Sequence, residues 1–133
     1  MYALRYGAYI SSADKHVYFA GDTGYGPHFN EIAQRYPIIT TALLPIGPTD
    51  KEDENGINRH GKEHVNAQEA IQSFIDLKAH EFIPMHYGTF FPGKDTLEYP
   101  LEKLQSTWQR RAQELENRAL NIITCGKTHA LAQ

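Results

Sequence analysis

The feature that most constrains the fold is a short apolar run, Thr41-Ala42-Leu43-Leu44-Pro45-Ile46, in which polar and apolar residues do not alternate. A run of this length is typical of a strand that is buried on both faces, as in a parallel sheet covered by helices. Two further short runs, His16 to Ala20 and Phe82 to Met85, are rich in apolar and aromatic residues, and segments of helical periodicity separate the three. The sequence therefore predicts an α/β fold in which strands and helices alternate.

The remaining elements are predicted from their start signals and their periodicity. Pro27 opens one helix, and Asn66-Ala67-Gln68-Glu69 has the form of a capping box that opens a second. A long amphipathic helix is marked by apolar residues from Leu101 to Leu115, with Trp108 on its apolar side. The segment from Ala3 to Ile10 is expected to form a hairpin with His16 to Ala20, and Leu120 to Thr124 a last strand.

Composition and charge exclude several classes of protein. The 133 residues contain 13 Lys and Arg against 16 Asp and Glu, a net charge of -3, so the clustered basic residues that bind nucleic acid are not expected. The single cysteine, Cys125, is interpreted as a small buried residue at the end of a strand in a reducing compartment. No secretory signal or membrane-spanning run is visible. We expect a cytoplasmic protein, with peripheral membrane association as the alternative.

Candidate ligands for a metal ion lie in loops that follow the predicted strands, where open α/β sheets place their sites. The loops Gly21 to Gly26, Gly47 to Val65 and His86 to Phe90 hold or adjoin Asp22, His28, His60, His64 and His86. Taken singly, each of these is most simply a turn, cap or surface residue. Asp22 and His86, however, each come just after an apolar strand and each have a glycine within two residues, Gly21 and Gly88. Together they favour oxygen and nitrogen ligation of a transition metal.

A zinc-peptidase pattern competes with this interpretation. His60-Gly61-Lys62-Glu63-His64 satisfies H-x-x-E-H, in which two histidines one helical turn apart bind zinc and the glutamate acts as general base. That chemistry requires a helix, yet Gly61 lies inside the pattern and the helix start signal at Asn66 comes after it. A peptidase is therefore kept only as an alternative.

Four segments occur here in the same order as in metallo-β-lactamase-fold hydrolases, and over about residues 1–115 the chain resembles the C-terminal half of these enzymes. The segments are Phe19 to Tyr25, Leu44 to Gly47, His64 to Ala70 and Met85 to Phe90. The branch it resembles most comprises the N-acyl-phosphatidylethanolamine-hydrolysing phospholipase D proteins and their bacterial relatives. The ascorbate-6-phosphate lactonase group is more distant.

The resemblance implies a four-layer αββα sandwich with a dinuclear metal site at one edge. Zinc is the expected metal, with iron and manganese as alternatives, at two ions per complete site. Asp22 matches the aspartate that bridges the two metals, and His86 matches the last histidine ligand. His64 matches a histidine that contacts the scissile group or delivers a proton to the leaving group. Tyr25 and Tyr87 are predicted to bind substrate, and a metal-bound hydroxide is expected to attack a phosphodiester, lactone or related ester.

One departure from the family pattern determines how much of the enzyme this chain represents. The H-x-H-x-D-H motif, which supplies most of the metal ligands, is absent, and no H-x-H occurs anywhere in the sequence. A catalytic zinc normally has three protein ligands, so Asp22 and His86 are too few for a dinuclear site. We therefore expect residues 1–133 to be the C-terminal half of the domain, inactive alone and with an empty or partly filled site.

The partners expected for such a half domain follow from what it lacks. They are the missing N-terminal half, a small-molecule or lipid substrate, and a second copy of the chain that covers an exposed sheet face. A non-catalytic binding or oligomerisation module is the alternative function.

Overall fold

The computed structural model describes residues 7–47, 63–89 and 96–131, and within them it contains one five-stranded sheet and three helices. It confirms the predicted α/β class. In chain order the elements are β1 (Ala8–Ser11), β2 (His16–Phe19), α1 (His28–Arg35), β3 (Thr41–Pro45), α2 (Ala67–Asp76), β4 (Glu81–Met85), α3 (Tyr99–Arg110) and β5 (Ala119–Leu120).

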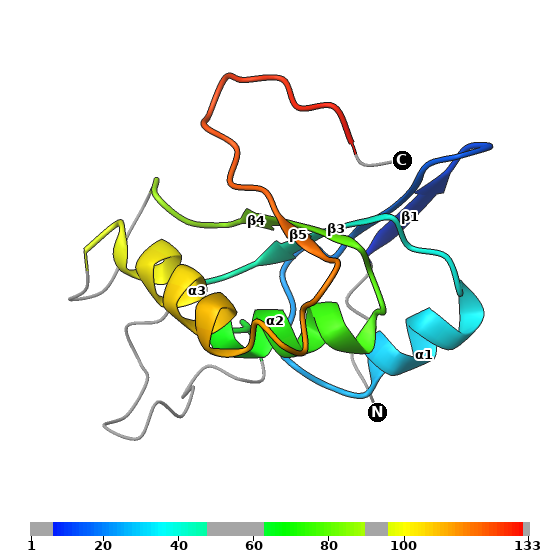
Figure 1. Cartoon of the computed structure of the whole chain (residues 1–133), viewed down its shortest axis with the longest axis horizontal. Helices are drawn as coiled ribbons and strands as arrows, with labels where there is room; N and C mark the ends of the chain where they lie inside the picture. The colour runs from blue at the N-terminus through cyan, green and yellow to red at the C-terminus, as the bar shows by residue number, and fades with distance from the viewer. Residues whose placement is uncertain (1–6, 48–62, 90–95, 132–133) are drawn as a thin grey trace.

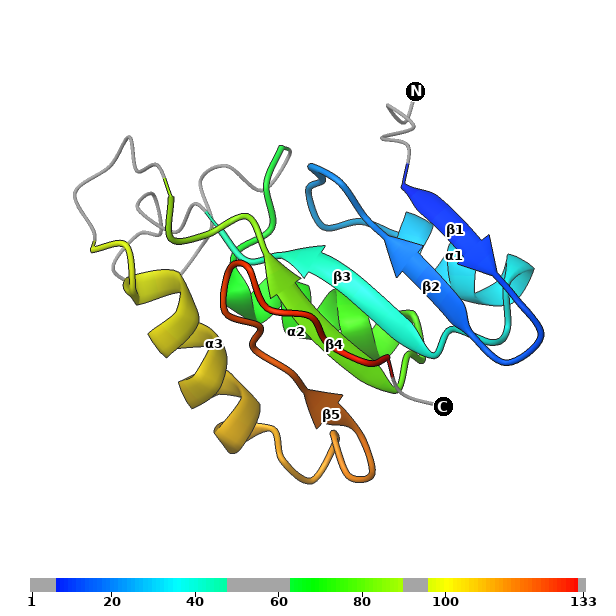
Figure 2. The same ribbon diagram turned by 90° about the horizontal axis from the view of Figure 1, so that it is seen from above.

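The sheet has the strand order β1-β2-β3-β4-β5. β1 and β2 form the predicted antiparallel hairpin, and every later pair in the sheet is parallel. One row of register partners, Tyr18, Ala42, Phe82 and Leu120, runs across the four parallel strands and packs in or against the core. Because β2, β3 and β4 are parallel, their carboxyl ends lie at the same edge of the sheet (Figure 2).

All three helices cover one face of this sheet (Figure 1). Each contributes completely buried side chains to the core, namely Phe29 from α1, Phe74 from α2 and Leu104 from α3. Burial of a large apolar side chain contributes about 1.5–3 kcal/mol, so this layer is the main source of stability. Trp108, predicted to be a core residue, is partly buried and packs against Phe74 with ring centroids 5.6 Å apart.

The predicted capping box is present at the start of α2. The backbone N–H of Glu69 donates to Oδ1 of Asn66 at 2.8 Å, and the backbone N–H of Asn66 donates to Oε2 of Glu69 at 3.1 Å. These bonds satisfy backbone donors that the first turn of a helix leaves unpaired. They fix the start of α2, and with it the direction of the chain that carries His64.

The last strand is shorter than predicted, because β5 ends at Leu120 rather than Thr124. The backbone N–H groups of Ala119 and Asn121 donate to the carbonyl oxygens of His80 and Phe82, each at 2.9 Å. The backbone N–H and C=O groups of the even-numbered residues in this part of β4 therefore point toward β5. The next donor on that side would belong to Pro84, which has no N–H, so the ladder stops and the two segments separate.

The chain after β5 crosses the sheet face opposite the helices (Figures 1 and 2). It covers Glu81, whose exposed fraction is 1%. The carboxylate of Glu81 accepts hydrogen bonds from Oγ1 of Thr41 and Nδ2 of Asn121, and Nε2 of His129 lies 2.6 Å from Oε1. The face that was expected to be bare is thus partly covered by the C-terminal segment, residues 121–131.

Two further sequence expectations differ from the structure. Cys125 is exposed rather than buried, because the early end of β5 takes it off the sheet. The long helix ends at Arg110, and the chain continues in turns as far as Asn117. Leu115 is nevertheless buried, at 3% exposure, so the turns still cover the core.

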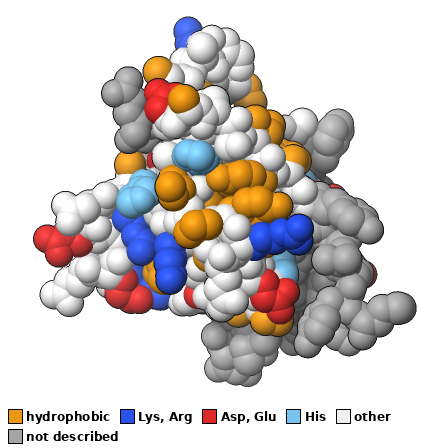
Figure 3. All heavy atoms as spheres, turned by 90° about the vertical axis from the view of Figure 1, so that its right-hand side faces the viewer, with side chains coloured by type: hydrophobic (Ala, Val, Ile, Leu, Met, Phe, Trp, Pro, Cys, Tyr) orange, Lys and Arg blue, Asp and Glu red, His pale blue; other side chains and the backbone are white. Residues whose placement is uncertain are grey.

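Large hydrophobic side chains remain on the surface, with Ile10 and Ile38 the most exposed at 65% and 56%. Figure 3, a view from the right-hand side of Figure 1, shows hydrophobic side chains gathered near the middle of that face. Among the residues that the structure describes, none of the helices has the length and apolar character needed to cross a bilayer. The cytoplasmic location stays a prediction.

Candidate metal centre

Asp22, His64 and His86 form one cluster at the carboxyl edge of the sheet. Asp22 follows β2, His86 directly follows β4, and His64 precedes α2. One ligand atom from each residue can be chosen so that all three atoms lie within 4.8 Å of one another. The structure therefore brings together three of the candidate ligands, from segments far apart in the sequence.

His86 is held in a defined orientation by the end of β3. Its Nδ1 atom lies 3.0 Å from the carbonyl oxygen of Gly47, and because a carbonyl only accepts, Nδ1 carries the proton. In the neutral ring the lone pair is then on Nε2, which lies 3.5 Å from Oδ1 of Asp22. A second hydrogen bond that fixes the tautomer is usual for metal-ligating histidines. His86 also has a φ of 61°, a left-handed conformation that is uncommon outside glycine and concentrates at functional sites.

The loop that carries Asp22 is joined by its backbone to the segment that carries His64. Gly21, with a φ of 64°, turns the chain after β2. The backbone N–H of Val65 then donates to the carbonyl oxygen of Thr23 at 2.8 Å. Both residues are buried, at 0% and 2% exposure. The hydrogen bond therefore fixes the relative positions of the two segments.

His64 is half-buried beside His86. The two imidazole rings are stacked, with centroids 5.5 Å apart and an interplanar angle of 19°. His64 was predicted to act on the substrate rather than on the metal. In the cluster it lies close enough either to bind a metal or to contact a substrate bound there. Its role stays a prediction.

His28 is not part of the cluster but hydrogen-bonds to Thr23, the residue that follows Asp22. It is the first residue of α1, and its Nε2 atom lies 3.1 Å from Oγ1 of Thr23. Because the Thr23 hydroxyl donates to the carbonyl oxygen of Gly24, it accepts from His28. Burial lowers the pKa of His28, which keeps its ring neutral.

A groove of about 910 Å³ opens beside the cluster. It lies where β4 and the chain after β5 separate, and its apolar lining comes from Pro84, Met85, Pro100, Leu101, Ile122 and Ile123. His64, His86 and the predicted substrate-binding residue Tyr87 also line it. Burial, with a smaller effect of the nearby Cys125, raises the pKa of the Tyr87 phenol, so it remains a hydrogen-bond donor at neutral pH.

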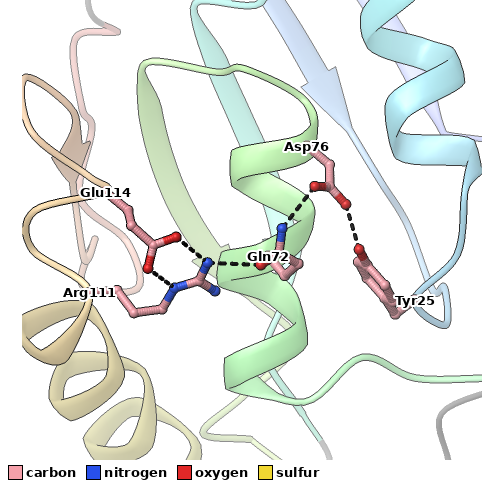
Figure 4. A network of polar contacts seen from close by, with 5 residues as sticks. All are labelled: Tyr25, Gln72, Asp76, Arg111 and Glu114. Carbon is pink, nitrogen blue, oxygen red and sulfur yellow. Dashed lines mark hydrogen bonds and ion pairs between the residues drawn. The ribbon is translucent and has the colours of Figure 1, made fainter.

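Tyr25 belongs neither to the cluster nor to the groove lining. Its hydroxyl donates to Oδ2 of Asp76 on α2 at 2.6 Å, as Figure 4 shows. The predicted contact of Tyr25 with substrate stays a prediction.

In the part of the zinc-peptidase pattern that the structure describes, the helix that this chemistry needs is absent. Glu63 to Asn66 are not helical, and α2 begins only at Ala67. His60 lies outside the described residues.

The side chains of the cluster are of the types that bind transition metals. Two imidazole nitrogens and a carboxylate suit zinc, iron or manganese, and three protein ligands are the usual number for a catalytic zinc. Sequence reasoning missed the part played by Gly47, because a backbone carbonyl leaves no trace in residue type. It also missed the groove, for which the only signal is a proline inside an apolar strand.

The structure thus combines a sheet covered by helices on one face with a histidine and aspartate cluster at the carboxyl edge of its parallel strands. Residues 3–87 match the family described as beta-lactamase superfamily domain. The chain belongs to that family.

Two curated proteins and one solved structure illustrate what the chain is similar to. The chain is 33% identical over 75 residues to the outer membrane protein RomA of Klebsiella pneumoniae. The aligned region covers 56% of this chain and 52% of RomA. It is 35% identical over 92 residues to the mitochondrial N-acyl-phosphatidylethanolamine-hydrolyzing phospholipase D of Saccharomyces cerevisiae, covering 67% of this chain and 18% of that enzyme. The structure of Igni18, a metallo hydrolase from Ignicoccus hospitalis, superposes with a TM-score of 0.60 at 27% identity, covering 91% of this chain and 43% of Igni18. The chain thus spans about half or less of each of these proteins.

Proposed function

We propose that this chain is the C-terminal half of a metal-dependent hydrolase domain in which Asp22 and His86 hold the metal. The observation that carries the proposal is the cluster itself, in which His86 presents Nε2 toward Asp22 because Gly47 occupies its other nitrogen. The further ligands of a dinuclear site come from a second segment that supplies the missing H-x-H-x-D-H motif. The partial coverage of RomA and Igni18 supports this division.

Each residue of the cluster has a distinct role in this proposal. When bound, zinc, iron or manganese supplies a nucleophile from water at neutral pH and stabilises charge that develops on the scissile group. Asp22 would hold the metal together with His86, through a carboxylate that is 62% exposed and would be shared between the two ions of a complete site. His64 contacts the scissile group or delivers a proton to the leaving group, and Tyr87 donates a hydrogen bond to the substrate.

The substrate class proposed is a phosphodiester, lactone or related ester, of a small molecule or a lipid. Two observations support it. The groove beside His64 and His86 is lined mainly by apolar side chains, which suits a substrate with an apolar part. The similar yeast protein is named for hydrolysis of a phospholipid.

Metal content per chain tests the proposal. The purified protein is dialysed exhaustively after zinc loading, and elemental analysis is compared for wild type, Asp22→Ala and His86→Ala. Asp14→Ala and His80→Ala, changes of the same type at exposed positions, are matched controls. Because the site lacks its further ligands, we expect wild type and the controls to retain only part of the full zinc complement, and both cluster variants to retain less. Equal zinc in all five proteins would show that the cluster does not bind metal.

Activity requires the second segment. We expect hydrolysis of bis(p-nitrophenyl) phosphate or of a lactone only after the N-terminal half of a relative such as RomA is joined to this chain. Asp22→Ala in the joined protein should abolish turnover, and unchanged turnover would contradict the assignment.

A homo-oligomer remains part of the proposal. Ile10 and Phe19, 65% and 42% exposed, offer apolar surface for a two-fold contact. Sedimentation of a single monomeric species across concentrations would contradict it.

A further inference from the structure

A short hydrogen bond connects the Asp22 loop to α2. The Tyr25 hydroxyl, three residues after Asp22, donates to Oδ2 of Asp76 at 2.6 Å (Figure 4). Burial, the hydrogen bond to Asp76 and nearby carboxylates raise the pKa of Tyr25 to about 12, so the phenol keeps its proton at neutral pH. A hydroxyl that donates to an ionised carboxylate makes one of the stronger hydrogen bonds in proteins.

Asp76 is itself held from its other oxygen. Nε2 of Gln72 donates to Oδ1 of Asp76 at 2.9 Å, and Nη2 of Arg111 donates to Oε1 of Gln72 at 2.8 Å. Arg111 is fixed in turn by two hydrogen bonds to Glu114, at 2.9 and 2.7 Å. Figure 4 shows these five residues as one network from the end of α3 across α2 to Tyr25. The acceptor for Tyr25 is therefore held by a series of hydrogen bonds that begins in the turns after α3.

Asp22 needs such support because its own side chain has little. The Asp22 side chain is 62% exposed, so packing does not fix it, and its position depends on how the loop is anchored. On one side the loop is joined to the His64 segment by the Thr23 to Val65 backbone hydrogen bond. On the other side Tyr25 stacks on Phe29, with ring centroids 6.2 Å apart, and hydrogen-bonds to Asp76.

We infer that Tyr25 is a positioning residue for Asp22, with Asp76 as its anchor, instead of the substrate contact predicted from the sequence. Its hydroxyl keeps the loop closed against α2, and the closed loop keeps Asp22 within reach of His64 and His86. The effect on metal affinity rests on the proposed function, whereas the effect on the loop does not.

Hydrogen exchange of the metal-free chain tests the loop directly. The Val65 amide reports whether the Asp22 loop and the His64 segment remain joined. Tyr25→Phe removes only the hydroxyl, and we expect Val65 to exchange about tenfold faster, the order of effect of one lost hydrogen bond to a charged group. The amide of Phe74, inside α2, should exchange at the wild-type rate. An unchanged Val65 rate, or equal acceleration at Phe74, would overturn the inference.

Cobalt titration, followed by visible absorption, tests the consequence for the metal. We expect Tyr25→Phe to weaken Co²⁺ binding about tenfold, the lower end of the usual effect of losing a partner that orients a ligand. Asp76→Asn keeps an acceptor oxygen and should bind Co²⁺ more tightly than Asp76→Ala. Glu114→Gln is the matched control, because it weakens the same network but leaves the Tyr25 to Asp76 bond intact.

The two measurements separate the two claims. Wild-type affinity in Tyr25→Phe would overturn the positioning role. If wild type binds no Co²⁺, the proposed metal site fails in this chain, and Val65 exchange alone still decides whether Tyr25 holds the loop.

Discussion

The backbone N–H of Val65 donates to the carbonyl oxygen of Thr23 at 2.8 Å, so the residues that directly follow His64 and Asp22 are joined to each other. Their relative position is thus set by main-chain groups in a buried environment rather than by the two side chains. Side-chain substitutions at the cluster should therefore change its chemistry while leaving this frame in place.

His64 offers the sharpest test of function at the cluster. If it acts on the scissile group, His64→Gln in the completed enzyme should lower kcat by at least about 10²-fold, the usual contribution of a positioned acid or base, and leave zinc content unchanged. If it is a third metal ligand, zinc content should fall with activity. Elemental analysis of the same preparation that is assayed distinguishes the two, and full activity with full zinc would contradict both.

His28 should make stability depend on pH. Burial lowers its folded-state pKa below the ordinary value of about 6.5, so between these two values the unfolded chain binds more protons. Stability is retained above about pH 6.5 and falls as the pH drops toward the folded-state value. His28→Gln can still donate to Thr23 but does not titrate, so its free energy of unfolding should fall less than that of wild type between about pH 7.5 and pH 5. Urea denaturation at both pH values measures this, and parallel losses would contradict it.

The capping box should contribute measurably to stability. Asn66→Ala removes the side-chain acceptor for the Glu69 N–H and should cost about 1 kcal/mol in urea denaturation. Gln68→Ala, a substitution inside the same helix, is the control and should have a smaller effect. Equal losses would mean that the cap contributes nothing beyond helix propensity.

Pro84 should control the separation of β4 from the segment after β5. Pro84→Val adds an N–H that faces this segment, and one hydrogen bond contributes about 1 kcal/mol. The added freedom of the unfolded chain costs about 0.4–1 kcal/mol, so the free energy of unfolding should change little. The groove should narrow instead, and Cys125, which lines it, should react more slowly with a thiol reagent. An unchanged rate would show that Pro84 is not what holds the groove open.

The parts of the site that could be predicted from sequence are those set by strand order. Asp22 and His86 each follow an apolar strand, and parallel strands end at one edge, so their proximity could be foreseen. The capping box at Asn66 could be predicted equally well, because it depends on two residues only three positions apart in the sequence.

The parts that could not be predicted depend on backbone groups and on packing over long distances. The role of Gly47 rests on its carbonyl, which every residue has. The exposure of Cys125 follows from a missing donor at Pro84, on a different strand. The cover over Glu81 comes from His129, 48 residues further along the chain.

The C-terminal segment has a consequence for how such a domain would be completed. Residues 121–131 occupy the sheet face on which the second sheet of an αββα sandwich would pack, and His129 lies 2.6 Å from the buried carboxylate of Glu81 there. An incoming layer must either pack over this segment or compete with it for the sheet. In the second case docking and release of the segment are coupled equilibria, and each shifts the other by the same free energy.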